Sequence, residues 1–328
     1  MEKKSTYKPN TSISLIELFK KFPDEETARK YVEEKRWNGK PACPHCNSEA
    51  VVVLERKDPK GYYRGHYRCK NCEKQFNVKT GISIFEKSKI PLHIWLIAFY
   101  FIVEDRCGVS SVTLAKRLKI TQKSAWKLGH KIRTAMEERI EEMNEDLILI
   151  RGTIELDESF LGGKEKNKHK DKKSGKRGTF GKHTIVGLIE RRENGRMRMF
   201  YTPYTREQKE ELGGFIKDTI LKNVKPGSAI YTDGAVYYSQ LYNIGYTVKS
   251  TECDDIHTNN IEGAWRALKD GARAIYKKTF AIKHIQRYLN EFAFRHNEGN
   301  QRYTTMERID SLIAGCWGRM LPYKVMVA

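Results

Sequence analysis

Three acidic residues stand where the expected secondary structure could bring them together. Asp157 follows β-prone residues in LILIRGTIELDESF, Asp233 ends the apolar run AIYTDG, and Glu262 lies in a segment with helical character. Carboxylates that converge repel one another unless divalent cations neutralise them, and hard oxygen ligands suit Mg²⁺ or Mn²⁺. Two such ions can activate a water or a 3′-hydroxyl and stabilise the leaving oxygen of a phosphodiester. The three acids therefore predict a two-ion site suited to phosphodiester chemistry.

Other acids compete for this role, because most Asp and Glu side chains are simply solvated. Glu155 shares a face with Asp157 in a regular strand, whereas Glu158 points the other way. The full set of rivals is Glu155, Glu158, Asp254, Asp255 and Glu291.

Four of the seven cysteines form two C-x-x-C pairs, in CPHCNSEAVVVL and GHYRCKNCEKQFNV. A two-residue gap lets both thiolates of a pair face one ion, so Cys43, Cys46, Cys69 and Cys72 predict a tetrahedral structural Zn²⁺. The rival is a redox pair, which does not need two C-x-x-C units. Cys107, Cys253 and Cys316 are isolated and suggest no site.

The acids need a sheet to hold them, and the chain alternates strand-like and helix-like segments from Leu147 onward. Three strands come first, in LILIRGTIELDESF, HTIVGLIERR and RMRMFYTPY. A helix at Glu207–Leu221, a strand ending at Asp233, the strand YTVKST, a helix from about Asn259 and a last helix at Lys283–Asn297 follow. This order suits an α/β class, ribonuclease-H-like core with a mixed sheet flanked by helices. In such a sheet the strands of Asp157 and Asp233 are neighbours.

The preceding residues predict smaller modules. Residues 1–40 look helical, with Asp24 as an N-cap, and residues 41–80 have the layout of a zinc ribbon. Residues 81–146 read as a helix-turn-helix-like module: Pro91 begins a buried helix, Ser110 or Ser111 can cap the next, and Thr121 can cap the third. We expect a catalytic domain at 147–300 and a C-terminal tail at 301–328.

The last helix of that module is rich in polar side chains able to reach base edges and phosphates. Trp126 on the same helix is expected to be core. The candidate DNA contacts are Gln122, Lys123, Lys127, Lys131 and Arg133, with Ser124 and His130 beside them.

The net charge of +20, from 61 basic and 41 acidic residues, favours a polyanionic partner over mere solubility or an acidic membrane surface, since clustered Lys and Arg release counterions from a phosphate backbone. Charge alone does not separate DNA from RNA. The basic run at 164–177 reads as a solvated loop that could also grip phosphate. No apolar run spans a bilayer and MEKKSTYKPN lacks a signal-peptide core, so we expect a cytoplasmic protein, nucleoid-associated when bound to DNA.

The strings IELDESFLGGK, YTDGAVYY, HTNNIEGAWRALKD and HIQRYLNEFAFRHN resemble the DDE-type transposases of bacterial insertion sequences, especially the zinc-ribbon-bearing, ISXO-like branch. The resemblance runs from about residue 40 to 298. It implies that Asp157, Asp233 and Glu262 are the catalytic triad, that His257 and Asn259 help to shape the site, and that Lys269 contacts DNA seven positions after the last acid. LGGK lacks the full Walker spacing and reads as a turn.

The resemblance implies an enzyme that binds the terminal inverted repeats of its element and performs metal-dependent strand cleavage and transfer. Its expected partners are double-stranded DNA, from transposon ends and target, and a second copy of the chain or a larger oligomer. Two alternatives stay open: a domesticated DNA-binding regulator without catalysis, and a metal-dependent nuclease that hydrolyses without joining strands.

Overall fold

The computed structural model describes residues 12–57, 61, 64–105, 107–138, 149–162, 169, 182–191, 195–242, 244–251, 256–276, 281–299 and 303–327. The chain divides into two compact units, Met1–Glu137 with Glu298–Ala328 (unit 1) and Glu138–Asn297 (unit 2). No helix within the described stretches has the length and apolar character needed to cross a lipid bilayer. The N-terminal residues 1–11, most of the basic run at 164–177, Cys253, Asp254 and Asp255 lie outside the described residues.

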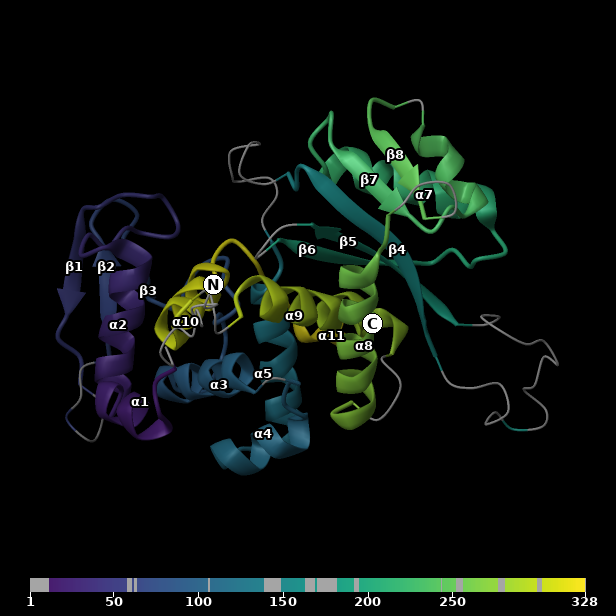
Figure 1. The fold of residues 1–328 in the computed structure, drawn as a ribbon. Coiled ribbons are helices and arrows are strands. Elements are labelled where there is room, and N and C mark those ends of the chain that lie inside the picture. The colour runs from purple at the N-terminus through teal and green to yellow at the C-terminus, as the bar shows by residue number, and fades with distance from the viewer. Residues whose placement is uncertain are drawn as a thin grey trace, which may run out of the picture. The chain divides into compact units, whose positions relative to one another are not determined.

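Unit 2 is built on a five-stranded mixed sheet in the order β6-β5-β4-β7-β8 (Figure 1). β4 (Thr153–Leu161), β5 (His183–Glu190) and β6 (Met197–Thr202) form an antiparallel meander. β7 (Ala229–Thr232) runs parallel to β4, and β8 (Thr247–Ser250) runs parallel to β7. β4 is therefore the central strand, and this ribonuclease-H-like arrangement confirms the predicted α/β core.

Helices cover both faces of this sheet. α7 (Lys209–Asn223) and the 3-10 helix η3 (Val236–Leu241) pack on one face. α8 (Asn259–Ala274) and α9 (Ile285–Asn297), the latter preceded by the short η4 (Ile282–His284), pack on the other. Both faces are thus covered, which explains why every position of β4 and β5 is buried or half-buried and neither strand has a polar solvent face.

Side-chain alternation along β4 separates its acids between the two faces. Ile154 and Leu156 pack with the core under α7, so the intervening Glu155 and the following Asp157 point to the α8 face. Glu158 points back to the α7 face, where it meets tyrosines of η3. The sequence prediction that Glu155 and Asp157 share a face is confirmed.

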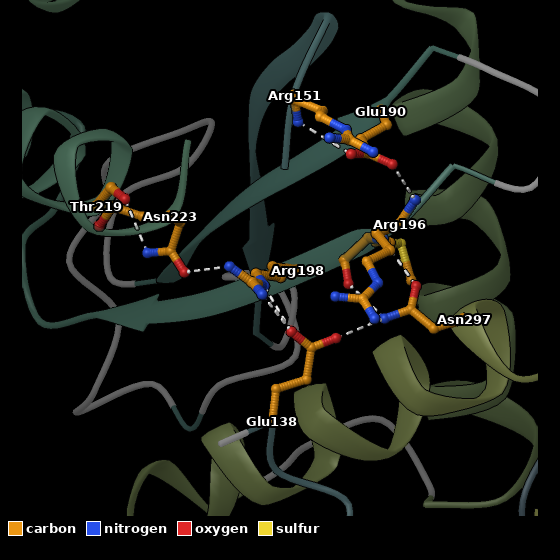
Figure 2. A network of polar contacts seen from close by, with 9 residues as sticks. Glu138, Arg151, Glu190, Arg196, Arg198, Thr219, Asn223 and Asn297 are labelled. Atoms are coloured by element: carbon orange, nitrogen blue, oxygen red, sulfur yellow. Dashed lines mark hydrogen bonds and ion pairs between the residues drawn. The ribbon is translucent and has the colours of Figure 1, made fainter. Parts of the chain in front are cut away.

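A polar network fastens the edge strand β6 within unit 2 (Figure 2). Arg198 donates from Nε to Glu138 Oε2 at 2.7 Å and from Nη1 to Asn223 Oδ1, at the end of α7, at 3.0 Å. Asn297, the last residue of α9, accepts from the backbone N–H of Met197 at 2.8 Å and donates to Glu138 Oε1 at 3.2 Å. Because Arg198 is nearly buried, these charge-assisted contacts offset its desolvation.

Unit 1 begins with α1 (Leu15–Lys21) and α2 (Glu25–Trp37), followed by a small antiparallel sheet of β1 (Val51–Leu54), β2 (His66–Cys69) and β3 (Gln75–Asn77). Asp24 caps α2 as predicted, accepting from the backbone N–H of Thr27. Trp37 packs edge-on against Tyr67 and Phe76 of the small sheet. The end of α2 is therefore joined to the small sheet through an aromatic core.

Three helices follow in unit 1: α3 (Leu92–Glu104), α4 (Ser111–Leu118) and α5 (Gln122–Ala135). Ser110 and Thr121 cap α4 and α5 through their side chains, as the sequence predicts. Lys119 adopts a left-handed conformation at the end of α4, which makes the turn into α5.

The predicted C-terminal tail at 301–328 is wrong. This segment contains α10 (Thr305–Ala314) and α11 (Tyr323–Val327), and both pack into unit 1. Arg308 of α10 forms an ion pair with Glu104 of α3, and Thr305 Oγ1 donates to the same carboxylate at 2.6 Å. The buried Ile309, Leu312 and Ile313 complete the core beside α2 and α3.

Candidate active site and metal centre

The register of the parallel pair β4 and β7 aligns the first two predicted catalytic acids. The pairing runs from Thr153 opposite Ala229 to Glu155 opposite Tyr231. Asp157 and Asp233 each lie two residues beyond the last of these pairs, on neighbouring strands that run in the same direction. Asp233 is held just past the end of β7, because its Oδ1 accepts the backbone N–H of Ala235 at 3.1 Å in a turn that Gly234 makes with φ +85°.

Glu262 reaches the same region from α8, which packs on the face of β4 that presents Asp157. Asp157 and Glu262 both line one open cavity of about 420 Å³. The cavity is lined by Asp157, Glu158, Ser159, Phe160, Glu262, Trp265, Arg266, Lys269, Asp270 and Arg273. Asp233 is not part of that lining, so the cavity opens toward the Asp157–Glu262 side of the site.

The electrostatics of Asp157 connect all three acids. Burial raises the pKa of Asp157 to about 6, and the carboxylates of Asp233 and Glu262 add to this rise by like-charge repulsion. An N–H donated by Trp265 at 2.8 Å acts in the opposite sense. A half-buried carboxylate destabilised by two neighbouring acids is the environment that a divalent cation relieves, and the oxygen-only donor set fits Mg²⁺ or Mn²⁺.

The three acids do not form a cluster as tight as a single-ion site. Among the described residues, only the four cysteines bring three or more Cys, His, Asp or Glu ligand atoms within 4.8 Å of one another. A two-ion site spans a wider space, because its ions stand about 3.5–4 Å apart and share ligands. The geometry is therefore compatible with two ions distributed among Asp157, Asp233 and Glu262.

The described rival acids have structural partners. Glu155 is fully buried and accepts hydrogen bonds from Asn260 Nδ2 at 2.7 Å and from the backbone N–H of Ile261 at 2.9 Å. Burial raises the pKa of Glu158 to about 7, and its two oxygens accept the hydroxyls of Tyr237 and Tyr238. Glu291 lies in the core of unit 2, paired with Arg295 and Tyr276.

Glu155 caps α8 from a neighbouring strand, a role that the sequence alone did not reveal. Thr258, at the N-cap position, makes no side-chain capping bond, and the carboxylate of Glu155 takes the free N–H of Ile261 instead. The charge also suits the positive end of the helix dipole. Glu155 thereby fixes the start of α8, one residue before Glu262.

We expect Glu155→Ala to lower the free energy of unfolding by about 2 kcal/mol, the upper range for loss of a helix N-cap. Urea denaturation of the variant and the parent measures it. Glu210→Ala is the matched control, because Glu210 is an exposed acid in the first turn of α7 and gives up only a screened dipole interaction. Equal stability losses for the two variants would contradict the capping role.

The predicted supporting residues surround the start of α8. His257 is exposed, and its backbone carbonyl accepts Arg191 Nη1 at 2.7 Å. Asn259 is the exposed first residue of the helix, while its neighbour Asn260 makes the bond to Glu155. Lys269 lines the cavity, two turns after Glu262 on the same helix face. Burial lowers the pKa of Lys269, and Asp157 opposes that change.

Sequence reasoning missed two cationic residues of this helix face. Arg266 and Arg273 line the cavity together with Lys269, and the positions 262, 266, 269 and 273 recur at helical spacing. That spacing was readable from the sequence, but only the docking of α8 shows which helix face the cavity exposes.

The four cysteines of unit 1 form the metal-binding cluster of the ribbon. Cys43 Sγ lies 3.6 Å from Cys72 Sγ, and Cys46 Sγ lies 3.6 Å from Cys69 Sγ. Tetrahedral Zn²⁺ with 2.3 Å bonds places its sulfurs about 3.8 Å apart, whereas a disulfide needs about 2.05 Å. The backbone N–H of Cys72, with that of Asn71, lowers the pKa of the Cys69 thiol to about 6, which favours the thiolate that zinc binds.

The predicted DNA contacts of α5 separate into two groups. Gln122 and Lys123 are exposed and Lys127 is half-buried, with its Nζ lying 4.0 Å from the ring centroid of Tyr323. Arg133 is only 5% exposed, and Lys131 donates to the backbone carbonyls of Ile84 at 2.7 Å and Glu86 at 3.3 Å. Lys131 is therefore occupied within unit 1, and Arg133 and His130 are buried.

Comparisons with known proteins agree with this architecture. Residues 149–297 match the ISXO2-like transposase domain, and residues 23–75 match the transposase zinc-ribbon domain. A protein of the transposable element ISH50 of Halobacterium salinarum is 27% identical over 161 residues, or 48% of this chain and 49% of that protein. The match thus spans about half the length of that relative, which comes from an archaeon.

Among solved structures, the Mos1 strand transfer complex covers 63% of this chain and 78% of its own chain, at 10% identity and a TM-score of 0.19. This similarity is too low to support a conclusion about fold or function.

Proposed function

We propose that the chain is a transposase that binds the terminal inverted repeats of its element and catalyses DNA cleavage and strand transfer, because residues 149–297 match the ISXO2-like transposase domain and residues 23–75 match the transposase zinc-ribbon domain. The observation that carries the proposal is the convergence of Asp157, Asp233 and Glu262, with Asp157 and Glu262 beside a cationic helix face in one cavity.

The chemistry is divided among these groups. Two divalent ions, Mg²⁺ or Mn²⁺, held by Asp157, Asp233 and Glu262, would supply Lewis-acid activation at the phosphodiester. Arg266, Lys269 and Arg273 lie along the same wall and offer cations to the phosphates that flank the scissile bond. Trp265 is buried beside Asp157, which is half-buried and lines the open cavity.

Unit 1 supplies the recognition surface in this proposal. The zinc ribbon and the α4–α5 pair form modules that can contact DNA, and Gln122, Lys123 and Lys127 remain on the accessible part of α5. Joining two transposon ends to a target requires two active sites acting together, so we propose a homodimer or a higher oligomer. The protein is expected to work in the cytoplasm, on nucleoid DNA.

The test is a strand-transfer assay with duplexes that carry the ends of the encoding element, in Mg²⁺ and in Mn²⁺, with a chelator as the negative control. Joined products that depend on the metal support the proposal. Cleavage without joining identifies a nuclease, and binding without cleavage identifies a regulator.

The proposed role of α5 gives a separate prediction. Replacing Lys123 and Lys127 by alanine should weaken binding to element-end DNA and reduce the slope of log affinity against log salt by about 2, because each lysine that contacts a phosphate contributes about 1. Fluorescence anisotropy over a salt series measures the slope. Lys217→Ala combined with Lys222→Ala on α7 removes the same charge elsewhere. An unchanged slope in the α5 variant, or an equal fall in the α7 variant, would remove α5 from the proposed interface.

A further inference from the structure

Trp265 makes a direct polar contact with a predicted metal ligand. Its indole Nε1 donates to Asp157 Oδ2 at 2.8 Å, and the residue is only 4% exposed. A tryptophan N–H is a donor only, so it binds the carboxylate. The backbone N–H of Glu158 also acts on this carboxylate and, like the indole, lowers the pKa of Asp157. The indole thus acts on one of the two oxygens of Asp157.

The sheet is shaped to admit this ring. Gly187 of β5 lies opposite Asp157 in the antiparallel register. A Cβ built on Gly187 would lie 2.6 Å from two ring atoms of Trp265 and 3.0 Å from Ile261 Cδ1. Gly187 is not among the glycines with positive φ, so the need for glycine at this position comes from the lack of space for a side chain and not from the backbone conformation. The indole therefore lies against bare backbone, directly beside Asp157.

The helix that carries Trp265 is also fixed in register with β4. Glu155 holds the backbone N–H of Ile261, and Trp265 follows one turn later on the same buried face as Ile261. Glu262 lies three residues before Trp265 and faces the cavity. Two polar links, at Glu155 and at Asp157, thus join the strand of the first acid to the helix of the last.

We propose that Trp265 is a positioning residue, which fixes the rotamer of Asp157 through the Nε1–Oδ2 hydrogen bond so that the carboxylate can bind a divalent cation together with Asp233 and Glu262. Because Gly187 has no side chain, it leaves the space that this contact needs. The inference rests on the proposed function, because it requires Asp157 to be a metal ligand.

The experiment measures metal binding and not activity. The full-length, zinc-loaded protein is titrated with Mn²⁺, and free Mn²⁺ is followed by electron paramagnetic resonance. Trp265→Phe keeps an aromatic ring and removes the donor, so we expect Mn²⁺ affinity to fall about 10-fold or more, as is typical for loss of a hydrogen bond to a metal ligand. Gly187→Ala keeps the indole but displaces it, and a fall in the same direction is expected. Trp126→Phe, on α5 in unit 1, serves as the control with parental affinity.

Folding and metal binding must be separated in this test. Replacing Trp265 by β-(3-benzothienyl)alanine keeps the bicyclic ring and exchanges the N–H for sulfur, so a loss of affinity in that variant reports the hydrogen bond alone. Near-ultraviolet circular dichroism checks that each variant keeps its tertiary packing. Parental Mn²⁺ affinity in both the phenylalanine and the benzothienyl variants overturns the inference.

Asp157→Asn distinguishes failure of this inference from failure of the proposed function. If the parent binds Mn²⁺ and Asp157→Asn does not, the metal site stands and the Trp265 variants decide the inference. If the parent and Asp157→Asn give the same titration, the proposed metal site itself is wrong.

Discussion

Asp157→Asn should lower strand transfer by at least about a thousand-fold while leaving DNA binding intact. Replacing a charged ligand of a two-ion site removes several kcal/mol of transition-state stabilisation, and ~4 kcal/mol corresponds to about a thousand-fold in rate. The change is isosteric, and asparagine can still accept the N–H of Trp265 through its side-chain oxygen. Single-turnover strand transfer with element-end duplexes measures the effect, and Glu262→Gln should behave alike.

The same substitution should affect stability in the opposite direction to activity, because it relieves repulsion between the acids. Asp157 is destabilised by burial and by Asp233 and Glu262, so the neutral Asp157→Asn variant is expected to be at least as stable as the parent when no divalent metal is present. Asp218→Asn is the control, because Asp218 is an exposed acid on α7, across the sheet from α8. In the strand-transfer assay, an Asp157→Asn variant that keeps more than about a tenth of the parental rate would show that this acid is dispensable.

Cys46→Ser should abolish zinc binding and unfold the ribbon. Structural zinc contributes about 10–16 kcal/mol to folding in zinc-finger peptides, and a ribbon of three short strands has little core to replace it. Cys46 is exposed, so the substitution opens no cavity and the loss is attributable to the missing ligand. Elemental analysis measures bound zinc, and limited proteolysis reports new cleavage within residues 23–75.

Cys107→Ser is the matched control for this experiment. Cys107 is also exposed, but it lies outside the cysteine cluster, so zinc content and protease resistance should remain parental. Full zinc content in Cys46→Ser would mean that three thiolates suffice. The catalytic domain should keep its protection in either variant, because its core contains none of the four cysteines.

Much of the local structure could be predicted from the sequence. The helix starts at Asp24, Ser110 and Thr121 agree with the structure, because a capping side chain and its backbone partner are only three residues apart. The neighbouring strands of Asp157 and Asp233 followed from the expected ribonuclease-H-like sheet, and the shared face of Glu155 and Asp157 followed from alternation along the strand. The metal cluster was likewise predictable, because its four cysteines lie within one short segment at zinc-binding spacing.

The boundaries of the units were not readable in the same way. The helix α10 packs with α2 and α3. Its Arg308 contacts Val103 and Glu104, which are more than 200 residues earlier in the sequence. The polar residues of α5 also looked equivalent, yet Arg133 faces the interior and Lys131 is held by backbone carbonyls. Which polar side chains of a helix are buried and which are exposed is decided only when the helix packs against its neighbours.

The sequence by itself determined which chemistry the chain offers: four thiolates at zinc spacing, three acids at the ends of predicted elements and a strong positive charge. Tertiary structure alone decided how those groups are held. The parallel pairing of β4 and β7 brings the strands of Asp157 and Asp233 side by side, Glu155 caps a helix that begins about a hundred residues later, and Gly187 leaves room for Trp265 beside Asp157. Such contacts depend on register and helix docking, which arise from packing between distant segments, whereas caps, turns and ligand spacings depend only on neighbours along the chain.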